Sequence, residues 1–304
     1  METALVTGVT GFLGSALVEA LLDRGGRVIG IGRRDKGFLS DRIVRDQQFI
    51  LCKLDLTQDI TTTLSEYTID TIFHLAAQQP SSPNLSFDDF YKGNVVTTRN
   101  VITLAKQSVR QFIYVSTVAV WGATDKELRE DVSPTPSNYY GLTKYIAERL
   151  IEIELHQTNV QATVVRFPSL YGRNHLGGVI YTYYQLAKEG KSIEVYGRGA
   201  TVRNALYVDN AVDALCRVAG KRENLAPFEI FLTGSANALP MVKIAEYIRD
   251  CLHSSSKIVL IDKPLPSPQD MHVNIEKAKH LLGFNPMTLE DGIRRYVQNM
   301  LTHP

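Results

Sequence analysis

Residues 3–34 read TALVTGVTGFLGSALVEALLDRGGRVIGIGRR, and this stretch decides the fold. A short apolar run leads into Gly8, Gly11 and Gly14, a helical pattern of apolar residues follows, and a second strand-like run spans 28–31. Gly8 permits a tight bend, Gly11 lets the backbone approach a pyrophosphate, and Gly14 lets the helix pack against the strand. The amides at the helix N-terminus then face the anion. This order of strand, glycine turn, helix and strand predicts a dinucleotide-binding unit.

The composition is that of a globular protein with no electrostatic preference for polyanions. Of 304 residues, 44% are hydrophobic and 21% charged, and 33 Lys and Arg face 32 Asp and Glu. We therefore expect no nucleic-acid partner. Cys52, Cys216 and Cys251 show neither a C-x-x-C pair nor metal-ligand spacing, which indicates free thiols and no metal. No apolar run approaches the roughly 18 residues of a membrane helix, and Met1 leads almost directly into the first strand, so we expect a cytoplasmic protein without a membrane partner.

The rest of the N-terminal half continues the alternation of strands and helices. Apolar runs at 49–56, 70–77 and 111–116 read as strands, and a helical pattern runs through 91–105. Alternation without internal repeats predicts an α/β fold with a Rossmann-type, doubly wound parallel sheet and a smaller C-terminal substrate-binding α/β domain. The expected division is a dinucleotide-binding domain at 1–170, to which 205–219 return, and a substrate domain at 171–204 and 220–304.

The end of the second strand bears on the choice of cofactor. An Asp or Glu there accepts hydrogen bonds from the ribose 2′-hydroxyl of NAD, whereas Arg accommodates the 2′-phosphate of NADP. The chain has Arg33 and Arg34 at this point and no carboxylate until Asp35. Because guanidinium groups make bidentate contacts with phosphate, we expect NADP(H) to be preferred. NAD(H) stays possible, since Asp35 could turn back to the ribose.

A helical pattern at 137–155 carries Tyr140 and Lys144, which lie on one helix face because they are four residues apart. Hydride transfer to a ketone leaves an alkoxide that needs a proton, and a phenol can donate it only if its pKa of about 10 is lowered. A nearby ammonium stabilises the phenolate. The strand at 111–116 delivers Ser116 and Thr117 to the carboxyl edge of the sheet, where ligands of such folds bind. These residues predict hydride-transfer chemistry.

Taken together, T-G-x-x-G-F-x-G at 7–14, STVAVWG at 116–122 and Tyr140-x-x-x-Lys144 resemble the extended short-chain dehydrogenase/reductases, namely the NAD-dependent epimerase/dehydratase family that modifies nucleotide sugars. The resemblance implies an enzyme in which Tyr140 is the general acid/base and Lys144 binds the nicotinamide ribose and tunes Tyr140. It also implies that Thr117, five residues before Gly122, hydrogen-bonds the reacting oxygen. A homodimer formed through two helices per subunit is a further implication.

The same resemblance supplies the cofactor-binding residues and one neighbour of the site, Asn94, whereas the interpretation of His74 comes from its place in the sequence. Asn94 matches a family Asn that lies mid-helix near the catalytic tyrosine, whereas His74, a lone histidine that ends a core strand, is interpreted as structural. The cofactor-binding residues implied are Gly8, Thr10, Gly11, Phe12, Leu13, Gly14, Arg33, Arg34, Asp55, Leu56, Leu75, Ala76, Ala77, Tyr140, Lys144 and Phe167.

The substrate side departs more from the family pattern. RFPSLYGR at 166–173 is similar to a family segment in which Asn contacts a substrate phosphate, and Ser169 takes that position. The stretch 195–210 resembles a nucleotide-sugar motif whose Arg corresponds to Arg203, a candidate for gripping a diphosphate. With Thr117, these are the expected substrate-binding residues. Further along, Tyr181, Tyr183 and Tyr184 are read either as the lining of a sugar pocket or as packing.

The residues after Thr117 narrow the reaction. Nucleotide-sugar dehydratases carry an acidic pair there, and Val118 and Ala119 cannot do that acid/base work. With Arg33 and Arg34, the sequence favours NADPH-dependent reduction of a keto group on a nucleoside-diphosphate sugar, specifically a 4-keto-6-deoxy sugar. One alternative is an NAD-dependent nucleotide-sugar 4-epimerase. Another is a non-catalytic dinucleotide-sensing protein, although such proteins often lose the Tyr or Lys that this chain keeps.

Overall fold

The computed structural model describes residues 2–122, 124, 127–263 and 270–302. Within it the chain forms two compact units: the first comprises 1–122, 133–166 and 212–231, and the second 123–132, 167–211 and 232–304. The sequence-based division places the boundary at 170 and returns 205–219 to the dinucleotide-binding part. The assignment of cofactor and substrate binding to the two parts stays a prediction, because the contacts divide the chain without indicating what each unit binds.

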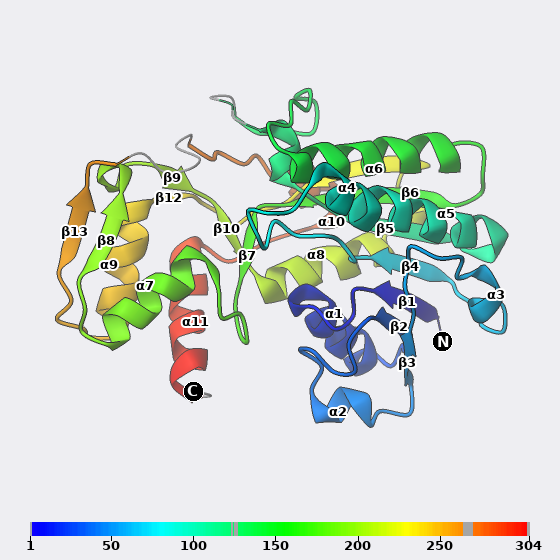
Figure 1. Cartoon of the computed structure of the whole chain (residues 1–304), viewed down its shortest axis with the longest axis horizontal. Coiled ribbons are helices and arrows are strands. Elements are labelled where there is room, and N and C mark those ends of the chain that lie inside the picture. Colours follow the sequence, from blue (N-terminus) through cyan, green and yellow to red (C-terminus); the bar gives the residue numbers. More distant parts are fainter. Residues whose placement is uncertain (1, 123, 125–126, 264–269, 303–304) are drawn as a thin grey trace. The chain divides into compact units, whose positions relative to one another are not determined.

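A seven-stranded sheet is the centre of the first unit (Figure 1). Its strands are β1 (Thr3–Thr7), β2 (Arg27–Gly32), β3 (Phe49–Lys53), β4 (Thr71–His74), β5 (Gln111–Thr117), β6 (Gln161–Phe167) and β11 (Phe228–Leu232). Their order is β11-β6-β5-β4-β1-β2-β3, and β1 pairs in parallel with β2 and β4, β2 with β3, and β4 with β5. Read from β3 to β6, this is the Rossmann order. The expected doubly wound sheet is confirmed.

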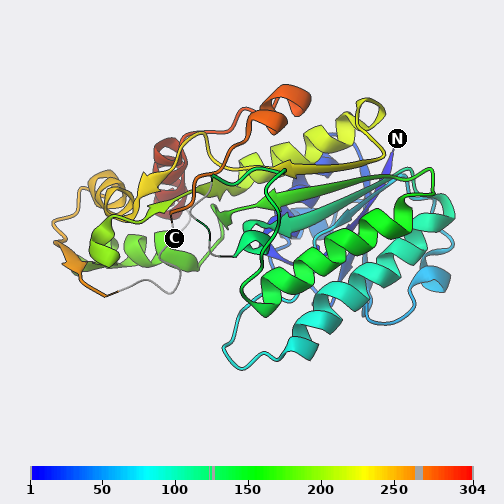
Figure 2. The ribbon, with the colours of Figure 1, turned by 90° about the horizontal axis from the view of Figure 1, so that it is seen from above.

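Helices cover both faces of this sheet. In Figure 2, α5 and α6 lie side by side over one face, and α1 covers the other. Helical elements of this part of the chain are α1 (Phe12–Asp23), α2 (Asp41–Val44), α3 (Thr61–Leu64), α4 (Phe87–Phe90), η1 (Tyr91–Val96), α5 (Thr97–Ser108), η2 (Val118–Trp121), α6 (Tyr139–Leu155), α8 (Val208–Gly220) and η4 (Arg222–Asn224). The expected helix through 91–105 is not uniform, because its first turn, η1, is π-helical. A π turn inserts one residue into the helix and changes the direction of the side chains it carries.

The second unit is a smaller α/β structure, as expected. Its sheets are two-stranded: β7 (Ser169–Tyr171) pairs in parallel with β10 (Ala205–Tyr207), β8 (Ile193–Tyr196) in parallel with β13 (Ile258–Ile261), and β9 (Val202–Arg203) antiparallel with β12 (Leu239–Pro240). Its helical elements are α7 (Gly178–Lys188), η3 (Gly197–Gly199), α9 (Met241–Cys251), α10 (Glu276–Leu282) and α11 (Leu289–Thr302).

Four tyrosine rings contact one another in the core of the second unit. Tyr171 lies edge-on to Tyr207 and Tyr296, with ring centres 5.5 and 6.0 Å apart, and Tyr184 contacts Tyr296 at 5.8 Å. Tyr184 is fully buried, and its hydroxyl donates to the Met300 carbonyl. Of the two sequence-based interpretations of these aromatics, packing therefore describes Tyr184.

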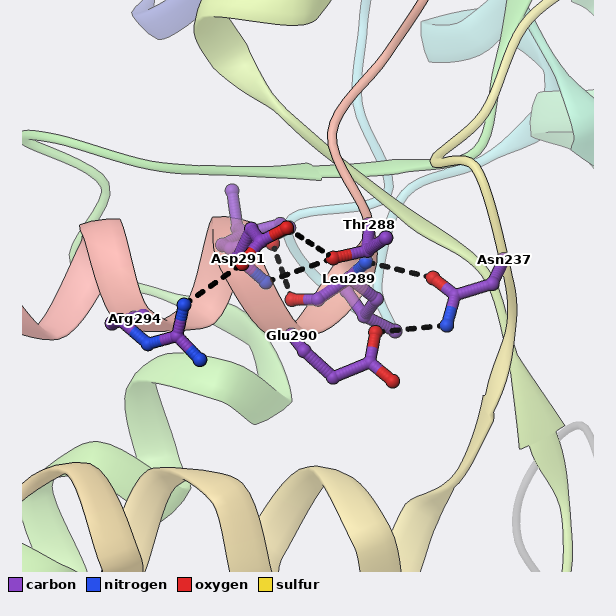
Figure 3. A network of polar contacts seen from close by, with 7 residues as sticks. Asn237, Thr288, Leu289, Glu290, Asp291 and Arg294 are labelled. Atoms are coloured by element: carbon purple, nitrogen blue, oxygen red, sulfur yellow. Dashed lines mark hydrogen bonds and ion pairs between the residues drawn. The ribbon is translucent and has the colours of Figure 1, made fainter.

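The N-terminus of α11 is closed by its own polar network (Figure 3). The Thr288 hydroxyl accepts a hydrogen bond from the Asp291 amide at 3.1 Å, and the Asn237 side chain accepts one from the Leu289 amide at 2.8 Å. The Asn237 amide also donates to the Glu290 carboxylate at 2.8 Å. These partners satisfy amides that a helix N-terminus otherwise leaves unpaired, so the side chains of Thr288 and Asn237 cap α11.

Candidate active site

The glycine turn has the geometry expected of a dinucleotide cradle. Gly8 has φ +70°, and a Cβ on it would lie 2.8 Å from the Ala76 amide nitrogen. A Cβ on Gly14 would lie 2.3 Å from the Gly8 carbonyl oxygen, so α1 approaches β1 as closely as only glycine allows. Gly11 is the N-cap of α1, whose first turn carries no acidic residue. The positive end of the helix dipole is therefore suited to an anion.

Thr7, the last residue of β1, organises the edge of this cradle. Its hydroxyl oxygen accepts hydrogen bonds from the amides of Leu75 and Ala76, both at 3.1 Å. The same oxygen lies 2.7 Å from Nδ1 of His74, the last residue of β4. Two of the residues predicted to line the cofactor, Leu75 and Ala76, are thus held by a side chain that lies 68 and 69 positions away in sequence.

His74 is fully buried and continues the network. The Thr98 hydroxyl donates to the Asn94 carbonyl at 2.5 Å, so it accepts from Nε2 of His74 at 3.0 Å. Nδ1 of His74 then accepts from the Thr7 hydroxyl, which defines a neutral tautomer with the proton on Nε2. Burial, with a smaller effect of the Lys144 charge, lowers the pKa of His74 to about 3. His74 is a positioned structural residue, consistent with its interpretation from the sequence.

Asn94 connects the loop after β4 to α6. It is fully buried on the π turn, and its side-chain oxygen accepts from the Gln78 amide at 2.7 Å. Its side-chain nitrogen donates to the Thr143 hydroxyl at 2.9 Å, and that hydroxyl donates to the Tyr139 carbonyl at 2.8 Å. Asn94 therefore holds the residue immediately before Lys144.

Tyr140 and Thr117 meet at the C-terminal end of β5. Asn138 caps α6 by accepting the Gly141 amide at 2.8 Å, which places Tyr140 in the first turn. Burial raises the pKa of the Tyr140 phenol, and hydrogen bonds with the side chains of Gln79 and Thr117 oppose this rise. The predicted pair of a phenol and a hydroxyl is thus brought together.

Lys144 lies one turn further along α6 and is 2% exposed. Its ammonium donates to the Val115 carbonyl at 2.6 Å and lies 3.9 Å from the centre of the Tyr114 ring. Burial lowers the pKa of Lys144 to about 7, and the charge of Glu148 acts in the opposite direction. The lysine therefore changes its charge in the neutral pH range.

The residues predicted to select the cofactor follow β2. Arg33 and Arg34 are exposed, and the carboxylate of Asp35 pairs with Lys53 at the end of β3. Asp35 is thus engaged by a lysine in this structure.

Asp55 and Leu56 lie just past β3 and differ in their surroundings. Hydrogen bonds from Thr57, and to a smaller extent the charge of Arg33, lower the pKa of Asp55. Leu56 is 7% exposed and packs in the hydrophobic core of the first unit. At the glycine turn, the ring of Phe12 contacts that of Phe38, with centres 6.2 Å apart.

Three further predicted positions lie at the end of β6 or in later strands. Phe167 ends β6 and is buried, and Ser169 begins β7 and is exposed. Arg203 is partly exposed, and one of its guanidinium nitrogens donates to the Val202 carbonyl at 3.2 Å. Burial lowers the pKa of Arg203, and the charge of Asp270 opposes this.

A buried carboxylate near Lys144 escaped the sequence analysis. Glu148 is 1% exposed and forms an ion pair with Arg166. The signal that could have found it is spacing, because Tyr140, Lys144 and Glu148 repeat at four-residue intervals along one face of α6.

The described part of the chain contains no cluster of three or more His, Cys, Asp or Glu side chains able to hold a metal ion. Within the same residues, no helix has the length and apolar character needed to cross a membrane.

Comparison with known sequences identifies one family. The model of the NAD dependent epimerase/dehydratase family matches residues 4–234. An uncharacterized UDP-glucose epimerase of Bacillus subtilis is 28% identical over 309 residues, which cover 95% of each chain. A UDP-glucuronate 4-epimerase of Thermodesulfobacterium geofontis is 27% identical over 96% of this chain and 94% of its own. UDP-glucuronic acid decarboxylase 1 of Danio rerio is 27% identical over 97% of this chain and 71% of its own.

Solved structures share the fold. A UDP-glucose 4-epimerase of Thermotoga maritima, determined with UDP-glucose, superposes with a TM-score of 0.88 at 23% identity, covering 99% of both chains. A UDP-galactose 4-epimerase gives a TM-score of 0.82 at 25% identity, again over 99% of both chains.

Proposed function

The chain belongs to the NAD-dependent epimerase/dehydratase family, and from this premise we propose that it is an NAD-dependent nucleotide-sugar 4-epimerase. The observation that carries the proposal is the meeting of the Tyr140 phenol with Thr117, one helical turn from the buried Lys144. The relatives named above as epimerases of UDP-glucose and UDP-glucuronate support a UDP-linked hexose or hexuronate as the substrate.

NAD fits the residues present at the glycine turn. A side chain at Gly8 or Gly14 would collide with backbone atoms, and the first turn of α1 offers its positive end without an acidic competitor. Gly8, Gly11 and the start of α1 would hold the pyrophosphate. When bound, NAD supplies reversible acceptance and return of a hydride.

The protein side chains would manage the accompanying proton. Tyr140 takes the proton of the sugar hydroxyl when the carbon is oxidised and returns it when the carbon is reduced. The hydroxyl of Thr117 hydrogen-bonds the reacting oxygen. Because burial raises the pKa of Tyr140, its phenolate needs a cation nearby, and we assign this role to the Lys144 ammonium, one helical turn further along α6.

The two residues that follow Thr117 cannot supply the acid needed for elimination of water. Val118 and Ala119 are the first residues of η2, and both are apolar. The proposal therefore stays with transfer of a hydride and a proton at one carbon.

A second function, reduction of a 4-keto-6-deoxy sugar by NADPH, is favoured by one observation. Arg33 and Arg34 are exposed just beyond β2, and Asp35 pairs with Lys53. A pair of guanidiniums suits a 2′-phosphate. A reductase needs an exchangeable reduced cofactor, whereas an epimerase regenerates the NAD it holds.

Identification of the cofactor and of the products separates these functions. The purified protein is denatured, the released nucleotide is identified, and fresh protein is incubated with UDP-glucose, UDP-galactose or UDP-glucuronate. A 4-epimerase releases NAD and interconverts epimers without added cofactor. A reductase instead consumes NADPH with a 4-keto sugar, and a decarboxylase forms a UDP-pentose and CO₂. Either of those results, with no epimer formed, overturns the primary proposal.

A further inference from the structure

Glu148 forms a buried polar cluster with Arg166 and Ser116, which we call the clamp. Its Oε1 accepts from Nε of Arg166 at 3.1 Å, and its Oε2 accepts from Nη2 of the same guanidinium at 2.6 Å. The Ser116 hydroxyl also donates to Oε1. The guanidinium of Arg166 lies 4.5 Å from the centre of the Trp121 ring. Both charged side chains are 2% exposed, so a bidentate pair in a fixed orientation holds the carboxylate.

The clamp joins the two elements that carry the site residues. Ser116 immediately precedes Thr117 on β5, and Glu148 follows Lys144 by one turn of α6. Tyr140, Lys144 and Glu148 lie at i, i+4 and i+8 on one helix face. A shift of the Glu148 carboxylate would therefore move the strand end that carries Thr117 relative to the helix face that carries Tyr140.

The charges around Lys144 make Glu148 the local counter-charge. Three titratable groups interact directly with Lys144, namely His74 on β4, Tyr114 on β5 and Glu148 on α6. Two more interact with these: Tyr140 with Tyr114, and Arg166 of β6 with Glu148. His74 is neutral because its pKa is about 3, and burial raises the pKa of Tyr114 well above 10. Glu148 is the group among them whose charge raises the pKa of Lys144 against the lowering effect of burial.

We infer that Glu148 is a positioning residue: its carboxylate, held by Arg166 and Ser116, sets the end of β5 against α6 and lets the buried Lys144 ammonium retain its proton to a higher pH than burial alone would allow. Its effect on turnover rests on the proposed function, in which that ammonium stabilises the Tyr140 phenolate. Its effect on the charge of Lys144 is a property of the folded protein and is measurable without a substrate.

The test titrates Lys144 by the ¹³Cε NMR signal of lysine-labelled protein, with the resonance assigned by its loss in Lys144→Met. Glu148→Gln removes the negative charge that raises the pKa of Lys144 and leaves the buried charge of Arg166 in place, so the midpoint should fall by about 1 to 2 pH units. Because this variant could fail to fold, the double variant Glu148→Gln, Arg166→Met removes both charges. Its midpoint should lie between those of the wild type and the single variant.

Two controls separate charge from geometry. Glu154→Gln removes a partly exposed carboxylate of α6 that pairs with Lys106 of α5, and it should leave the Lys144 midpoint unchanged. Ser116→Ala keeps the Glu148 charge but removes its hold on β5, so kcat should fall about tenfold without a shift in the midpoint.

The pH profile of kcat gives the catalytic readout. Its alkaline limb should move to lower pH in the double variant, in step with the NMR midpoint. A folded double variant whose midpoint equals that of the wild type overturns the inference. If the wild type turns over none of the UDP-sugars, the proposed function fails, and the NMR midpoints still decide whether Glu148 controls the charge of Lys144.

Discussion

The Lys144 ammonium lies 3.9 Å from the centre of the Tyr114 ring while it donates to the carbonyl of Val115. A cation carried by α6 is therefore held on β5 by a ring face and a carbonyl, neither of which carries a formal charge. A desolvated cation above an aromatic ring gains electrostatic stabilisation. This contact still leaves Lys144 easier to deprotonate than a lysine in water, because burial lowers its pKa to about 7.

Replacement of Tyr140 by Phe tests the acid/base role directly. The ring and its contact with Phe90, at 6.3 Å between centres, are retained, so the fold and the affinity for NAD should change little. Turnover should fall by about 10²-fold or more because no group then exchanges the proton. Steady-state kinetics and titration of the cofactor measure the two effects, and full activity of this variant contradicts the mechanism.

The burial of Lys144 makes stability depend on pH. Its pKa is about 7 in the folded protein and 10.5 as the ordinary value, so between these values the unfolded chain binds a proton that the folded chain lacks. Stability contributed at this position therefore rises with pH. Between pH 7.5 and 9.5, the free energy of unfolding of the wild type should rise by roughly 2 to 3 kcal/mol relative to Lys144→Met.

Urea denaturation of both proteins at the two pH values measures this difference. Lys106→Met is the matched control, because Lys106 is an exposed lysine paired with Glu154. Its difference from the wild type should stay nearly constant over the same range. A constant difference for Lys144→Met as well would show that Lys144 is not destabilised by burial.

His74 should stay neutral throughout the physiological range. Because its pKa is lowered to about 3, the folded protein should show no titration of this imidazole between pH 5 and 8. The hydrogen bonds from Thr7 and to Thr98 fix the proton on Nε2. Long-range ¹H–¹⁵N NMR spectra report both properties. A titration midpoint near 6.5, or a proton on Nδ1, would contradict this network.

The sequence predicts those parts of the fold and site that depend on local spacing. Gly8, Gly11 and Gly14 predict the turn because each position requires a backbone without a Cβ. The structure shows a close approach of backbone atoms at Gly8 and Gly14. Tyr140 and Lys144 can be placed on one face because four residues make about one helical turn. Such inferences need no knowledge of distant parts of the chain.

Features that join distant residues could not be predicted in this way. The bond between Thr7 and His74 spans 67 residues, and that between Asn94 and Thr143 spans 49. Neither pair has a sequence pattern of its own. Helical spacing could have predicted that Glu148 shares a face of α6 with Tyr140 and Lys144. Its buried ion pair could not be predicted, because the partner, Arg166, lies on β6. Long-range side-chain pairing becomes visible only in the folded sheet.

Substitution of Gly14 by Ala should disrupt the cradle. Its Cβ would lie 2.3 Å from the Gly8 carbonyl oxygen, so α1 must move away from β1, and the protein should lose about 1–3 kcal/mol of stability. Gly220→Ala is the matched control, because a Cβ there meets nothing within 4 Å. Thermal unfolding and NAD titration should show losses of stability and affinity for Gly14→Ala alone. Equal behaviour of the two variants would contradict the close approach.

The double substitution Arg33→Ala, Arg34→Ala tests the choice of cofactor. If these guanidiniums contact a 2′-phosphate, the variant should lose about tenfold or more of its affinity for NADPH, while its affinity for NADH, which lacks that phosphate, stays the same. Arg45→Ala, Arg42→Ala is a control with the same loss of charge in and just after α2. Binding titrations at constant ionic strength separate contact from general attraction, because a general field would weaken NADPH binding in both double variants. An unchanged ratio of the two affinities in Arg33→Ala, Arg34→Ala would remove the case for NADP and with it the observation that favours a reductase.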